Sequence, residues 1–131
     1  MDSIGWVDLT VGDATNLRDF YARVMGWRPE PVDMGGDADF NMCDAGTGVP
    51  AAGVCHARGL NADLPPVWMV YFKVADLELS LGEAEAAGGT RLQGPRQAGG
   101  TRYAVVRDPA GAVFAVLEAA AELPEPPPAV P

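Results

Sequence analysis

The chain of 131 residues carries one short pattern twice, at a spacing of 63 positions. In each copy a strand-like run and an aspartate, Asp13 or Asp76, are followed 13 positions later by a glycine, Gly26 or Gly89. Aspartate can accept hydrogen bonds from the free amides of a first helical turn, and glycine commonly ends a helix. The repeat therefore predicts two similar α+β modules. Two such modules can face each other across a concave surface, where small molecules bind.

The first module is expected to run strand, helix, strand, strand, strand. Its helix carries apolar residues at helical spacing, which predicts one buried stripe made of Leu17, Phe20, Tyr21 and Val24. Its strands are expected at residues 4–11, 27–32, 38–43 and 51–57, separated by turns rich in glycine and aspartate.

The second module is expected to repeat this order after a polar linker at 58–66. Its helix begins at Asp76 and ends at Gly88 and Gly89. Strands are expected at 67–75, near 91–93, at 102–107 and at 112–118, with a tight turn at 108–111. We expect one domain over residues 1–120, with modules at about 3–57 and 67–120, and an extended proline-rich tail at 121–131.

The composition limits the partners. A formal net charge of −9 and a pI near 4.3 argue against binding to nucleic acid or to an anionic membrane, because both need clustered Lys and Arg. No apolar run is long enough to span a bilayer, and the N-terminus lacks the pattern of a secretion signal. We therefore expect a cytoplasmic protein. Its two cysteines, Cys43 and Cys55, are expected to be reduced thiols.

Several short strings, taken in order and on these expected elements, resemble the vicinal oxygen chelate superfamily, which includes glyoxalase I, bleomycin-resistance proteins and extradiol dioxygenases. The strings are Val11-Gly12-Asp13, Phe20-Tyr21 before Met25-Gly26-Trp27, the set Pro66, Trp68, Tyr71, Val74 and Asp76, and Asp108-Pro109-Ala110-Gly111. The resemblance covers residues 4–120. It implies an α+β fold in which two tandem βαβββ modules form a cupped, curved mixed sheet with helices on its outer face. It also implies a homodimer.

Enzymes of this superfamily typically hold a divalent metal ion with His and Glu side chains from the first and last strands of each module. The matching positions here are Trp6, Met69, Ala115 and either Gly53 or Cys55. Such ions need imidazole, carboxylate or thiolate ligands, and only Cys55 offers one. We therefore expect neither a metal ion nor another cofactor.

The side chains expected to face the cup suggest a ligand site instead. Trp6, Asp8, Met69 and Tyr71 project from the two first strands, and Tyr103, Cys55 and Ala115 are added from later strands. Aromatic and thioether side chains around a few polar groups are typical of a pocket for a planar or apolar ligand. The alternative is that the same side chains fill the cup as a second core.

Two residues are weighed as catalytic groups. Asp8 is a weak candidate for a general base if burial raises its pKa. His56, the single histidine, is either a base or metal ligand, or a half-exposed residue at a strand end. Alternation along the strand places it on the face opposite Cys55.

The sequence thus predicts a protein that binds a small aromatic or amphipathic molecule in the cup without a metal ion. One alternative is a metal-independent enzyme of the lyase or isomerase type that uses Asp8, Tyr71 or Tyr103. Others are a metal-dependent glyoxalase or dioxygenase, and a regulatory domain whose cup is closed.

Overall fold

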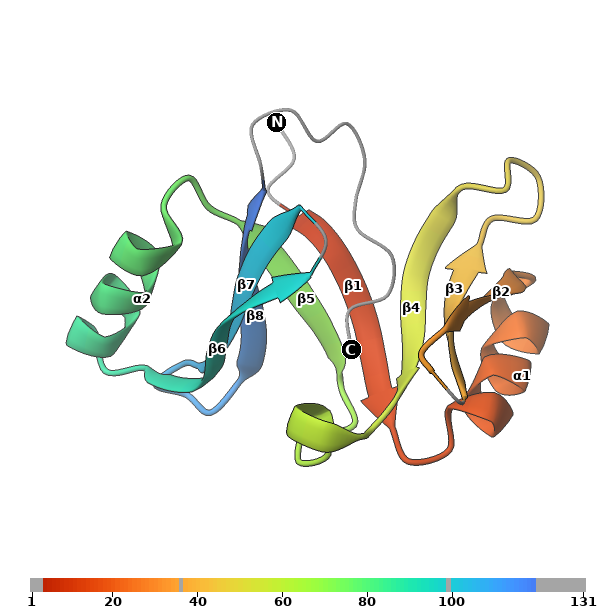
Figure 1. Cartoon of the computed structure of the whole chain (residues 1–131), viewed down its shortest axis with the longest axis horizontal. Helices are drawn as coiled ribbons and strands as arrows, with labels where there is room; N and C mark the ends of the chain where they lie inside the picture. Colours follow the sequence, from red (N-terminus) through yellow and green to blue (C-terminus); the bar gives the residue numbers. More distant parts are fainter. Residues whose placement is uncertain (1–3, 36, 99, 120–131) are drawn as a thin grey trace. The chain divides into compact units, whose positions relative to one another are not determined.

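The computed structural model describes residues 4–35, 37–98 and 100–119, and the tail expected at 121–131 lies outside them. The order of elements confirms the α+β class with two βαβββ modules (Figure 1). In chain order they are β1 (Ile4–Val11), α1 (Ala14–Met25), β2 (Arg28–Asp33), β3 (Ala38–Cys43), β4 (Pro50–His56), the short 3₁₀ helix η1 (Gly59–Asn61), β5 (Trp68–Lys73), α2 (Leu77–Ala86), β6 (Thr90–Ala98), β7 (Thr101–Arg107) and β8 (Val113–Ala119).

The chain divides into two compact units, and the strands of each are ordered in the same way. The first unit is Val7–Trp68, and the second joins residues 4–6 to the chain from Met69 onward. In the first unit the order is β2-β3-β4-β1, with β1 parallel to β4 and the other pairs antiparallel. In the second it is β6-β7-β8-β5, with β5 parallel to β8. The repeat in the sequence is thus a repeat of topology.

Both helices begin at the aspartates that mark the repeat. The Asp13 carboxylate accepts a hydrogen bond from the backbone N–H of Asn16 at 3.1 Å, and Asp76 accepts one from Leu79 at 3.1 Å. Gly26 ends α1 with φ +70°, whereas α2 turns at Gly88, with φ +99°, one residue before the glycine that the repeat matches. Neither helix is long and apolar enough to cross a membrane, within the residues that the structure describes.

In the first unit, α1 packs against the sheet beside β2, β3 and β4 (Figure 1). The buried residues of this core are Ala14, Phe40, Met42 and Val54. Half-buried side chains complete it, and Trp68 is one of them: its indole Nε1 donates to the Tyr21 hydroxyl at 3.1 Å. Trp68 therefore lies on the helix side of the sheet.

The single apolar stripe predicted for α1 is wrong in part. Leu17 and Tyr21 pack on the core, but Phe20 is 54% exposed and Val24 60% exposed. The buried side of the helix is centred on Ala14, whose small methyl group lets the helix approach the sheet closely. Phe20 lies about 120° around the helix axis from Ala14, so it points away from the sheet.

In the second unit, α2 packs on a core of Leu77, Leu81, Ala104, Val106 and Val116. The turn expected at 108–111 is present, with the Gly111 N–H donating to the Asp108 carbonyl at 2.9 Å. β6 is longer than the strand expected near 91–93, because two register shifts against β7 let the strand continue to Ala98.

Candidate functional site

The strand register shows which residue of β4 matches Ala115 of β8. In the first unit Asp8 lies opposite Gly53, and in the second Tyr71 lies opposite Ala115. Asp8 and Tyr71 are 63 positions apart and so are counterparts in the repeat. Gly53 is therefore the counterpart of Ala115, while Cys55 pairs with Thr10.

The positions at which relatives would hold a metal ion are consequently Trp6, Met69, Gly53 and Ala115. They offer an indole, a thioether, no side chain and a methyl group, none of which binds a hard or borderline divalent ion. Over residues 4–35, 37–98 and 100–119, no group of three or more His, Cys, Asp or Glu is arranged to hold a metal ion. The residues do not fit the metal that the resemblance implies.

The second unit gathers aromatic side chains on the sheet face opposite α2. Residues directly opposite each other in a ladder share a face. The register therefore gives one row of Gln93, Val105, Ala115 and Tyr71, and a neighbouring row of Arg96, Tyr103, Leu117 and Lys73. The rings of Tyr71 and Tyr103 lie 5.8 Å apart between centroids, inclined by 55°. Both tyrosines are 2% exposed.

Two polar side chains of β6 border these rings. Arg96 places its guanidinium carbon 5.6 Å from the centre of the Tyr103 ring and donates from Nη1 to Oε1 of Gln93 at 2.6 Å. The register shift between Gln93 and Arg96 brings both to one face of the sheet. This pair was not among the residues predicted for the site. Gly94 and Pro95 between them are the available signal, since both residues are typical of a bulge within a strand.

Trp6 and Met69 belong to the same unit, and each is 4% exposed. A Cβ atom placed on Gly5 would lie 2.7 Å from Cδ2 of Leu117 and 3.0 Å from Cγ of Lys73. The backbone just before Trp6 therefore lies against the row that contains Tyr103. We use the name aromatic face for Met69, Tyr71 and Tyr103 together with Trp6, which is buried in the same unit.

The other two predicted site residues, Asp8 and Cys55, belong to the first unit and are also buried. Burial, and then the nearby carboxylates of Asp8 and Asp39, raise the pKa of the Cys55 thiol. The thiol therefore stays protonated at neutral pH, which makes Cys55 a poor nucleophile and a poor metal ligand.

His56 ends β4 beside two carboxylates that the sequence analysis did not connect with it. Its Nδ1 lies 3.6 Å from Oδ1 of Asp39 and 4.0 Å from Oδ2 of Asp37. Arg58 binds both carboxylates, with Nη2 2.8 Å from Oδ1 of each. The histidine side chain is 19% exposed. His56 is thus a strand-end residue within a charged cluster.

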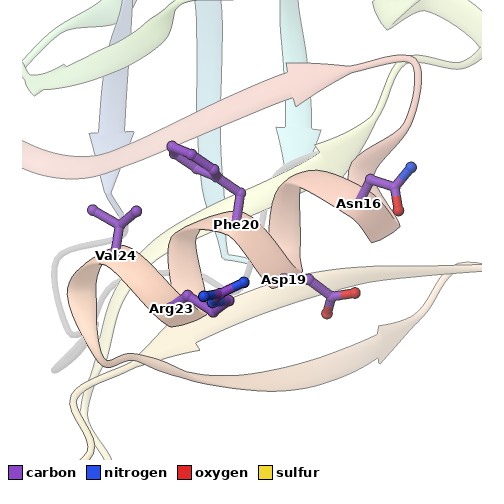
Figure 2. Close-up of a pocket in the computed structure, with 5 residues that line it drawn as sticks. All are labelled: Asn16, Asp19, Phe20, Arg23 and Val24. Atoms are coloured by element: carbon purple, nitrogen blue, oxygen red, sulfur yellow. The ribbon is translucent and has the colours of Figure 1, made fainter.

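A separate surface hollow lies on the outer side of α1 (Figure 2). Its lining residues are Asn16, Asp19, Phe20, Arg23 and Val24. All five come from one helix, and none was predicted as a site residue. The hollow follows from the two apolar side chains, Phe20 and Val24, that α1 leaves exposed.

Comparisons with known proteins identify the family and agree with the fold described above. The model of the family described as "Glyoxalase-like domain" matches residues 6–117. The chain belongs to this family. The resemblance to the vicinal oxygen chelate superfamily is therefore confirmed. The glyoxalase-like chain is also 29% identical over 86 residues to the "Putative glyoxylase CFP32" of Mycobacterium bovis and of Mycobacterium tuberculosis. These 86 residues are 64% of this chain, which spans about a third (33%) of the length of those relatives.

Solved structures similar to this glyoxalase-like chain share its fold. A Streptomyces coelicolor methylmalonyl-CoA epimerase variant, in complex with 2-nitronate-propionyl-CoA, has a TM-score of 0.57 at 16% identity, over 92% of this chain and 99% of that one. A Legionella pneumophila structure titled NAD-dependent benzaldehyde dehydrogenase has a TM-score of 0.60 at 14% identity, over 88% and 98%. At these identities the likeness concerns the fold alone.

Proposed function

We propose that this chain binds a small aromatic or amphipathic molecule at the aromatic face of its second unit, without a metal ion. The observation that carries the proposal is the Tyr71–Tyr103 pair with the Arg96 guanidinium over one ring. Rings and a thioether supply apolar contact, and Arg96 with Gln93 supplies polar groups at the margin. The loss of ligating side chains at the family's metal positions supports the same proposal.

The competing arrangement is an aromatic face that is packed shut. Its four residues are 2–4% exposed, which suits both a closed core and a site that encloses its ligand. The two differ in what a ligand does to stability: a molecule that binds only the folded chain raises its Tm, whereas a closed core gives no shift.

A second candidate is a metal-independent enzyme of the lyase or isomerase type. The burial of Asp8, which is 1% exposed, favours it, because a carboxylate enclosed with a ligand can act as a general base. Asp8→Asn removes the base and keeps the shape of the side chain. Turnover of a ligand that this variant abolishes would move the assignment from binding protein to enzyme.

A thermal-shift panel of aromatic and amphipathic molecules tests the proposal, with calorimetric titration of each hit. Tyr103→Leu removes a ring from the aromatic face, and Phe114→Leu removes one from the opposite, α2-facing side of the same sheet. We expect hits whose affinity falls in Tyr103→Leu and is kept in Phe114→Leu. A panel without hits, or equal losses in both variants, would reject the proposal.

The homodimer expected from the sequence stays a prediction. Sedimentation velocity of the full chain at two concentrations measures it directly. We propose no nucleic-acid or membrane partner, because the chain carries nine Lys and Arg against 18 Asp and Glu, and so repels polyanions.

A further inference from the structure

One polar group near the aromatic face has no partner. The indole Nε1 of Trp6 is buried and forms no hydrogen bond within the part of the chain that the structure describes. By contrast, Nε1 of Trp68 donates to the Tyr21 hydroxyl at 3.1 Å. A buried indole N–H usually has an acceptor, because burying an unpaired donor is unfavourable. Trp6 therefore holds a donor that an additional molecule can satisfy.

The position of Trp6 connects this donor with the aromatic face. Gly5, the preceding residue, lies against Leu117, which is opposite Tyr103 in the β7–β8 ladder. The lack of a side chain at Gly5 permits this close approach, since a Cβ atom there would overlap with Leu117 at 2.7 Å. Trp6 is also the repeat counterpart of Met69, 63 positions later, and both side chains are buried in the same unit.

We infer that the ligand carries an acceptor oxygen, as in a ketone, an ester or a carboxylate, and that this oxygen binds the indole N–H of Trp6. The inference rests on the proposed function and narrows it. The apolar body of the ligand lies on Met69, Tyr71 and Tyr103, and the acceptor fixes its orientation. A hydrocarbon of the same shape leaves the donor unpaired and binds more weakly.

Matched pairs of probes test this inference on the full chain. 2-Acetylnaphthalene and acetophenone carry a carbonyl group, and 2-isopropenylnaphthalene and α-methylstyrene have nearly the same shape with a CH₂ group in place of the carbonyl oxygen. We expect each ketone to bind about five times more tightly than its hydrocarbon, the ratio that one neutral hydrogen bond provides. In Trp6→Phe, which keeps a ring but loses the N–H, this advantage should disappear. In Trp68→Phe it should persist.

The indole N–H signals of the ¹⁵N-labelled chain give a second readout. The chain has three tryptophans, so Trp6→Phe assigns the Trp6 signal by its loss. We expect the ketones to move the proton signal of Trp6 downfield, as hydrogen bonding does, and the hydrocarbons not to.

The outcomes separate the inference from the proposed function. Equal affinity for ketone and hydrocarbon, with an unmoved Trp6 signal, overturns the inference and leaves the proposed function in place. If no member of either pair binds and the thermal-shift panel gives no hits, both are overturned. If the panel gives hits that all lack an acceptor oxygen, only the inference is overturned.

Discussion

Arg58 holds the buried carboxylate of Asp39 with two of its N–H groups, at 3.1 Å from Nη1 to Oδ2 and 2.8 Å from Nη2 to Oδ1. The Asp39 side chain has no exposed surface, and the backbone N–H of His56 adds a third hydrogen bond at 2.9 Å. The pair ties β3 to the segment that follows β4. These hydrogen bonds hold the C-terminal end of β4, at His56, against β3.

Replacement of this arginine should destabilise the chain. Arg58→Met keeps most of the apolar stem but leaves the Asp39 carboxylate buried without its cation, so we expect a loss of about 3 kcal/mol in the free energy of unfolding. Arg91→Met is the control, since it breaks a surface ion pair with Glu85 at 3.2 Å and should change stability by less than about 1 kcal/mol. Urea denaturation measures both. Similar losses in the two variants would contradict the prediction.

The buried Cys55 thiol predicts a pH dependence of stability on the alkaline side. Its pKa is raised in the folded chain, first by burial and then by the charges of Asp8 and Asp39. An unfolded thiol loses its proton above about pH 8.5, while the folded one keeps it. The contribution to stability is therefore fully present below that pH and is lost as the pH rises toward the folded pKa.

The variant Cys55→Ser isolates this effect, because serine does not titrate in this range. Between about pH 8.5 and 10.5, the natural chain should lose up to about 1.4 kcal/mol of unfolding free energy per pH unit more than the variant. Urea denaturation at several pH values gives both slopes. Parallel slopes would show that the Cys55 thiol ionises in the folded chain as it does in the unfolded one.

Gly94 of β6 is predicted to tolerate no side chain, because the backbone of β7 lies so close to it. Its φ is +91°, and a Cβ atom there would lie 2.8 Å from the carbonyl oxygen of Tyr103 and 3.0 Å from Cα of Ala104. Gly111 has a similar φ of +97° with nothing within 4 Å, so it serves as the control. We expect Gly111→Ala to cost about 1–2 kcal/mol through backbone strain, and Gly94→Ala about 1–3 kcal/mol more. Thermal unfolding of both variants decides this, and equal losses would contradict it.

A chelator should have little effect on this chain, because the residues at the family's metal-binding positions cannot bind a metal ion. Because Trp6, Met69, Gly53 and Ala115 offer no suitable ligand, EDTA should leave the Tm within about 1 °C of the untreated value. Elemental analysis of the purified chain should find zinc, nickel, manganese and iron well below one per chain. A stoichiometric metal ion, lost with EDTA together with stability, would contradict both this prediction and the proposed function.

The elements of this fold could be predicted because their signals are local. Asp13 and Asp76 cap helices through amides three residues away, and Gly26 ends a helix through its own backbone. The 63-residue repeat then carries these local signals from one module to the other. The pairing of Gly53 with Asp8 could not be predicted, since it depends on register between strands separated in sequence.

Two polar contacts, one in each unit, could not be predicted from the sequence for the same reason. Arg58 and Asp39 are 19 positions apart, and nothing in either segment selects the other as a partner. Gln93 and Arg96 share a face because of a bulge, whereas regular alternation would place them on opposite faces. The composition of a site could thus be predicted, but not the contacts that orient it.

The side of α1 that carries Phe20 faces solvent and not the core. Phe20 is 54% exposed on the outer side of the helix, whereas Met42 is completely buried in the core under α1. Phe20→Ser should therefore change the free energy of unfolding by about 0.5 kcal/mol or less, and Met42→Ala should lower it by about 2–5 kcal/mol. Urea denaturation of the two variants compares them directly. If Phe20→Ser were the more damaging, the stripe predicted from the sequence would be the buried face after all, and the position of α1 on its sheet would be wrong.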